Sequence, residues 1–244
     1  MLKALLRVLL LCIFTAGARA EQGIEIAVLL KGMTNPYWKT LHDGVTDYAS
    51  EKGIEIYIQG VQSDQETEQQ LNVCNTMLLK KPKALIFAAV TGVTLAPCLK
   101  QASASGVLLV DVDGGMTEQE AAKMGIKLQF SVASDNYQLG KKAADYLSGI
   151  NGKVLLIEGL PGSIPGIQRA KGFKENLPKG LTLVASLPGN WDRLRAADIT
   201  NDVVTKHPDL AAIFAANDLM ALGAAEALFS RKIENVKVLG VDGI

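Results

Sequence analysis

The side chains that could do chemistry in this sequence stand directly after runs of apolar residues. They are carboxylates, amides, a few cations and planar aromatic rings: Lys31, Asn35, Tyr37, Trp38, Asp64, Asp113, Arg169, Trp191, Asn217 and Asp242. Carboxylates accept hydroxyl hydrogens, amides both donate and accept, and a guanidinium donates in a fixed fork. Aromatic faces suit the apolar C–H faces of a sugar ring. Because cations are few, the set predicts a neutral sugar rather than a phosphate or an amino acid as ligand.

The segment Thr34-Asn35-Pro36-Tyr37-Trp38 places two aromatic rings side by side, although the chain has only two tryptophans and five tyrosines. Pro36 is tolerated in the first turn of a helix, where its missing N–H costs nothing. We therefore expect a helix to begin here and to hold both rings at the end of the preceding strand.

Enzymatic chemistry is not indicated. The only two histidines, His42 and His207, fall within a helical pattern and before a proline, away from the strand ends. No Cys/His cluster has metal-ligand spacing, so we expect no catalytic residue, metal or cofactor. The glycine-rich stretch at 159–166 is neither a nucleophile elbow nor a phosphate loop, and its glycines are expected to let the backbone approach a ligand closely.

Each polar candidate also has a purely structural explanation. Asp113, Asp242 and Asn217 could cap helices, as these residue types often do, and Trp191 could pack in a core. Taken together, however, the candidates fall at the same end of the predicted strands, which favours a binding cleft.

Apolar runs alternate with helical patterns along the chain. Strands are predicted at 24–30, 54–60, 84–90, 107–113, 129–136, 153–159, 181–189, 211–217 and 237–243. Nearly continuous apolar runs are typical of parallel strands covered on both faces. The alternation predicts an α/β fold of two doubly wound parallel-sheet lobes, with ligands bound beyond the carboxyl ends of the strands.

The predicted organisation is a signal peptide over 1–20, a first lobe over 21–133 and a second lobe over 134–244. Residues 1–20 carry Lys3 and Arg7, a short apolar run and an Ala18-Arg19-Ala20 cleavage pattern. Cys12 lies inside the apolar run, which favours a cleavable leader over a lipoprotein signal. Charge is balanced, 25 basic against 25 acidic residues, so nucleic acid is not an expected partner. We expect an exported monomer.

The motifs TNPYW, VDVDGG, VASDN, the glycine loop before Arg169, NWDR, AANDLMALGA and GVDG, in this order, resemble those of periplasmic sugar-binding proteins of ABC importers, ribose-binding type. The resemblance covers residues 24 to 244. It implies a two-lobe hinged receptor that closes on a monosaccharide and delivers it to a membrane permease. The implied ligand contacts are Lys31, Asn35, Tyr37, Trp38 and Asp113 from the first lobe, Ser134 at the crossing, and Arg169, Trp191, Asn217 and Asp242 from the second lobe. Trp191 and the Tyr37–Trp38 pair would then enclose the sugar ring.

The sequence departs from the family pattern at two ligand positions and at its end. Gly114 replaces the arginine that often follows the aspartate, and AAVTG replaces a stretch that often holds an asparagine. An allose-like hexose therefore fits better than ribose. Family members continue past GVDG, so we expect the second lobe to be incomplete at its C-terminus. Residues 21–244 alone should then be destabilised and bind sugar weakly or not at all.

The two cysteines beyond the leader, Cys74 and Cys98, fall on the helices after the second and third strands. These helices can share a face of the sheet, but the cysteines differ in depth along them, so pairing is left open.

Two other functions fit the same residues. A periplasmic sensor would present the sugar to a chemoreceptor or kinase instead of a permease. A secreted glycosidase would need two facing carboxylates, and Asp113 and Asp242 are the most plausible pair.

Overall fold

The computed structural model describes residues 24–244, so the predicted leader, including Cys12, lies outside the described residues. Strands β1 (Ile26–Leu30), β2 (Ile56–Gly60), β3 (Ala84–Phe87), β4 (Leu108–Val112) and β5 (Leu128–Val132) form one parallel sheet in the order β2-β1-β3-β4-β5. Strands β6 (Gly152–Glu158), β7 (Leu181–Pro188), β8 (Leu210–Ala215) and β9 (Lys237–Leu239) form a second, in the order β7-β6-β8-β9. The predicted α/β class with two parallel sheets is confirmed.

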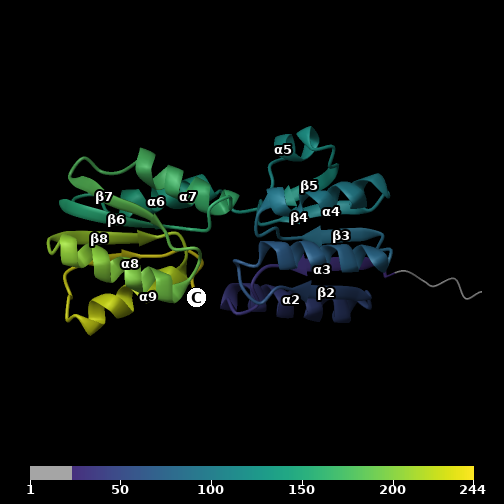
Figure 1. Ribbon diagram of the computed structural model, residues 1–244, viewed down its shortest axis with the longest axis horizontal. Coiled ribbons are helices and arrows are strands. Elements are labelled where there is room, and N and C mark those ends of the chain that lie inside the picture. Colours follow the sequence, from purple (N-terminus) through teal and green to yellow (C-terminus); the bar gives the residue numbers. More distant parts are fainter. Residues whose placement is uncertain (1–23) are drawn as a thin grey trace, which may run out of the picture.

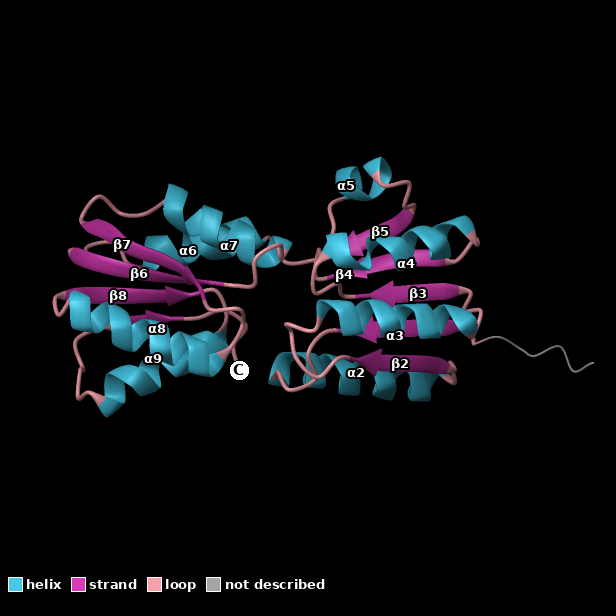
Figure 2. Ribbon diagram, viewed as in Figure 1, coloured by secondary structure: helices cyan, strands magenta, loops and turns pink. Residues whose placement is uncertain are grey.

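The two sheets point their carboxyl ends toward each other. Figure 1 shows two lobes side by side, and in Figure 2 the strand arrows of both sheets run toward the space between them. We call the β1–β5 sheet with its helices the first lobe, and the β6–β9 sheet with its helices the second lobe. Side chains that follow the strands of either sheet therefore meet between the lobes.

Helices α3 (Thr67–Leu79), α4 (Gly92–Ala104) and α5 (Glu118–Lys123) cover one face of the first sheet and enclose its core. Helix α2 (Pro36–Lys52) lies on the opposite face. The second sheet has a core on each face, with α6 (Asn136–Tyr146) and α7 (Ile164–Glu175) on one side and α8 (Arg193–Lys206) and α9 (Asp218–Ser230) on the other. None of the helices in the described part of the chain combines the length and apolar character needed to cross a membrane.

The predicted strand at 84–90 ends earlier than expected, at Phe87. The buried side chain of Gln70, from α3, takes over the next backbone groups. Its Nε2 donates to the carbonyls of Leu30 (3.1 Å) and Ala88 (2.8 Å), and its Oε1 accepts from the N–H of Val90 (2.8 Å). One glutamine thus fixes the ends of β1 and β3, and the candidate residue Lys31 directly follows β1.

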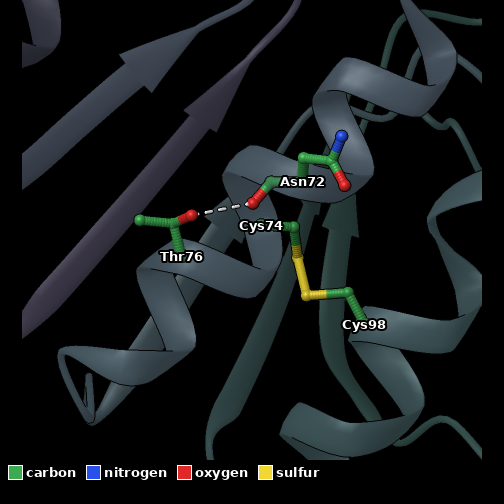
Figure 3. Close-up of a disulfide and its surroundings, with 4 residues drawn as sticks. All are labelled: Asn72, Cys74, Thr76 and Cys98. Atoms are coloured by element: carbon green, nitrogen blue, oxygen red, sulfur yellow. Dashed lines mark hydrogen bonds between the residues drawn. A yellow bond between two sulfur atoms is a disulfide. The ribbon is translucent and has the colours of Figure 1, made fainter.

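Cys74 of α3 and Cys98 of α4 are joined by a disulfide, with their Cα atoms 6.2 Å apart (Figure 3). Both cysteines are fully buried in the core of the first lobe. The bond ties together the two helices that pack side by side on this face of the sheet.

Candidate functional site

A cavity between the lobes collects side chains from both of them. Its lining consists of Lys31, Asn35, Tyr37, Trp38, Asp64, Asp113, Ser163, Pro165, Arg169, Trp191, Asn217 and Asp242. A larger groove of about 850 Å³ runs along α2 on the first sheet, but mostly aliphatic side chains line it. Because converging polar groups and rings mark a specific small-molecule site, the interlobe cavity is the candidate.

The polar wall of the first lobe is built around an ion pair. Lys31 Nζ lies 2.6 Å from Asp113 Oδ2, and both side chains are nearly buried. The same ammonium lies 5.0 Å from the ring centroid of Trp38, within cation–π range. Asp113 caps no helix, since Thr117 caps α5. The pair leaves Asp113 a second carboxylate oxygen with which to accept a hydrogen bond.

Asn35 is held on both sides by protein atoms. Its Oδ1 accepts from the N–H of Tyr37 (3.1 Å) and so caps α2, while its Nδ2 donates to Asp64 Oδ2 (3.2 Å). Asp64 Oδ1 in turn accepts from the N–H of Gly32 (2.8 Å). Burial raises the pKa of Asp64 above its usual value. Asp64 thus orients Asn35 and lines the cavity itself.

Helix α2 begins at Pro36, as predicted, and this turn positions the two rings. The rings of Tyr37 and Trp38 meet edge to face, with centroids 4.9 Å apart and planes at 87°. Trp38 is buried, whereas Tyr37 is 37% exposed. The two rings therefore present differently oriented surfaces to the cavity.

Arg169 organises the second lobe's wall. Its Nε donates to Asn136 Oδ1 (2.8 Å), and its Nη1 donates to the carbonyl of Ala216 (2.7 Å) and, at 3.4 Å, to Asp242 Oδ1. Its guanidinium carbon lies 6.0 Å from the ring centroid of Trp191. Asn136 was not among the predicted site residues, although it ends the VASDN motif.

Asn217 and Asp242 have different structural duties. Asn217 Oδ1 accepts from the N–H of Met220 (3.0 Å), so it caps α9 as well as lining the cavity. Asp242 caps no helix. Burial raises the pKa of its carboxyl to about 6, against the opposing effect of Arg169. Asp242 is therefore a desolvated acceptor that ionises fully only near neutral pH.

The comparison with known proteins agrees with this geometry. A protein family described as periplasmic binding protein domain matches residues 26–244. The chain belongs to the periplasmic binding protein family. It is of the ribose/allose-binding type, a group of binding proteins rather than enzymes.

Three relatives illustrate the similarity of this periplasmic binding protein to others. The D-allose-binding periplasmic protein of Escherichia coli K12 is 34% identical over 227 residues, which are 90% of this chain and 73% of that protein. The D-ribose/D-allose-binding protein of Pseudomonas aeruginosa is 29% identical over 93% of this chain and 73% of that protein. A solute-binding protein from Actinobacillus succinogenes, solved with bound D-allose, superposes with a TM-score of 0.81 at 31% identity, covering 91% of this chain and 79% of that chain.

Two glycines of the 159–166 stretch face an aromatic ring in this periplasmic binding protein. A Cβ at Gly159 would lie 2.2 Å from the indole of Trp191, and a Cβ at Gly166 would lie 3.0 Å from it. Gly159 and Gly166 therefore make room for the ring of Trp191. Asn190 and Trp191 both have positive φ, 57° and 63°, and this backbone turn brings the indole against Gly159 and Gly166.

Ser134 stands apart from the other predicted contacts. It is exposed in the segment between β5 and α6 and does not line the cavity. Its carbonyl accepts from Asn136 Nδ2 (3.1 Å), so it connects to the site through the residue that holds Arg169. The other nine predicted ligand contacts all line the cavity, together with Asp64, Ser163 and Pro165.

Proposed function

We propose that this chain is the sugar receptor of an ABC importer and binds an allose-like hexose or a related sugar between its lobes. The supporting observation is the composition of one cavity, which Asp113 and Asp242 line from different lobes together with three aromatic rings. The similarity to a D-allose-binding protein and a D-ribose/D-allose-binding protein supports the sugar class.

The mechanism follows from the division of contacts between the two lobes. The first lobe supplies the Lys31–Asp113 pair and the rings of α2, and the second supplies Arg169 and Trp191. A sugar bound to only one lobe would contact the side chains of that lobe and leave those of the other lobe without a ligand partner. Closure of the lobes about the segment at 133–135 lets both walls bind at once, so the ligand favours the closed form by its differential affinity. In the periplasm, the closed form would then present the sugar to a membrane permease for import.

The choice of ligand class rests on charge. Asp113 neutralises Lys31 at 2.6 Å, and Arg169 already donates to Asn136, Ala216 and Asp242. These cations therefore have little free charge for a phosphate or a carboxylate. The remaining acceptor oxygens of Asp113 and Asp242 suit sugar hydroxyls, which donate hydrogen bonds without carrying charge.

Tryptophan fluorescence tests the proposal, because both tryptophans of the chain, Trp38 and Trp191, line the cavity. The purified protein is titrated with D-allose, D-ribose and D-glucose into the millimolar range. The sequence alone predicted weak binding or none. Because nine of the ten predicted contacts line one cavity, we now expect a weak but saturable change with at least one sugar. Asp113→Ala should remove it, whereas Asp47→Ala, which alters an exposed aspartate of α2, should not. A flat titration with every sugar would refute the proposal.

A further inference from the structure

Ser163 is a buried hydroxyl in the cavity wall that the protein itself does not use. Its side chain lies at the start of α7 and is 2% exposed, yet it lines the interlobe cavity. Its Oγ has no hydrogen-bond partner among the described residues. Burying a hydroxyl without a partner is unfavourable, so the position of this group calls for a physical reason.

Helix capping does not supply that reason. Ser163 occupies the N-cap position of α7, where a serine usually accepts an N–H from the second or third residue of the helix. The second residue is Pro165, which has no N–H, and Ser163 makes no side-chain capping bond. The Ser163 hydroxyl therefore makes no capping hydrogen bond and remains free at the cavity surface.

The charged side chains of the cavity lack what the Ser163 hydroxyl offers. Asp113 and Asp242 can only accept when ionised, and Lys31 and Arg169 can only donate. A serine hydroxyl does both, so it can match a sugar hydroxyl in either orientation. We infer that Ser163 is a specificity-determining residue that exchanges a hydrogen bond with one hydroxyl of the bound sugar from the second lobe. This inference rests on the proposed function and adds a contact to it.

Ser163→Ala tests the inference, with Ser230→Ala as its control because Ser230 is exposed at the end of α9. Affinities for D-allose and its monodeoxy analogues are measured by calorimetry, and the thermal midpoint without sugar is measured in parallel. We expect Ser163→Ala to weaken D-allose binding about fivefold, the size of one net hydrogen bond. The midpoint should not fall, because the substitution breaks no bond within the protein.

The deoxy sugars separate contact from structure. For one analogue, the one lacking the contacted hydroxyl, wild type and Ser163→Ala should bind equally. Equal affinity of wild type and Ser163→Ala for D-allose would overturn the inference. It would also be overturned if Ser163→Ala bound every analogue more weakly by the same factor and had a lower thermal midpoint. If the wild type responds to no sugar, the proposed function fails and this inference fails with it; if only the Ser163→Ala difference is missing, the proposed function stands.

Discussion

Asp242 shows how burial can tune a single hydrogen-bond acceptor. Its pKa lies near 6 because the cavity desolvates the carboxylate, and the charges of Asp218, Asp113 and Asp64 add to this effect while Arg169 opposes it. Sugar hydroxyls that donate to the carboxylate favour its ionised form. Binding should therefore lower the pKa of Asp242 and release a proton wherever the free protein holds one.

Sugar affinity should accordingly depend on pH. Well above pH 6, Asp242 is ionised before binding and sugar affinity is at its plateau. As pH falls through about 6, the proton must be displaced, so affinity should drop by up to about tenfold per pH unit. Calorimetry between pH 5 and 8 measures this. Asp242→Asn should bind more weakly and lose the dependence; an unchanged slope in that variant would assign the titration to another group.

The packing of the Trp191 indole against Gly159 offers a second test at a single residue. Gly159→Ala would place a methyl 2.2 Å from the indole, so the ring must leave its position. We expect at least a tenfold loss of sugar affinity, about 1.4 kcal/mol, comparable with that of Trp191→Ala. Gly44→Ala in α2 is the matched control, because a Cβ at this position meets no atom within 4 Å, and this variant should bind sugar normally. Gly149→Ala does not serve as a control, because Gly149 has a positive φ. Normal binding by Gly159→Ala would argue against a ligand contact for Trp191.

At the scale of elements, the first lobe's strand ends depend on Gln70. Gln70→Ala would strip hydrogen bonds from the backbone groups of Leu30, Ala88 and Val90. Leaving such buried groups unpaired costs about 1–3 kcal/mol each when no water replaces the partner. We expect the free energy of unfolding to fall by at least about 2 kcal/mol in urea titrations. Gln129→Ala, which alters an exposed side chain of β5, should change it little.

The disulfide between α3 and α4 should stabilise the first lobe without touching the ligand. Cys74 and Cys98 are 24 residues apart, and closing such a loop in the unfolded chain is worth about 3 kcal/mol. The Cys74→Ala/Cys98→Ala double variant should therefore unfold at lower urea concentration while keeping its sugar affinity. A large loss of affinity would instead show that this pair of helices shapes the cleft.

The sequence predicted elements better than contacts. Nearly continuous apolar runs and Pro36 were enough to locate the strands and the start of α2. The six-residue helix α5 was missed because it is too short for helical periodicity, although its Thr117–Glu120 capping box is a local signal. Ser163 and Gln70 were missed because their roles depend on what faces them in space. Ser134 was placed in the site by its motif, but its side chain does not reach the cavity.

At the scale of the whole molecule, the lobes differ in how well their sheets are covered. On the α2 face of the first sheet, Leu108, Phe130 and Val132 are each at least half exposed. Exposed apolar surface on adjacent strands promotes association. We expect the protein to bind a hydrophobic dye in its native state. Phe130→Ser should reduce that signal and leave sugar affinity intact, since Phe130 does not line the cavity; an unchanged signal would mean that this face is not the source.

We propose above that one sugar is bound by both lobes together. The most direct measurement is a calorimetric titration of D-allose into the wild type, the first-lobe variant Asp113→Ala and the second-lobe variant Trp191→Ala, at pH 7.5. We predict saturable binding to the wild type, with both variants weakened at least tenfold, because each removes a wall of the same cavity. D-allose binding that survives unchanged in either variant, or a wild type that gives no saturable heat with D-allose, would contradict binding by both lobes.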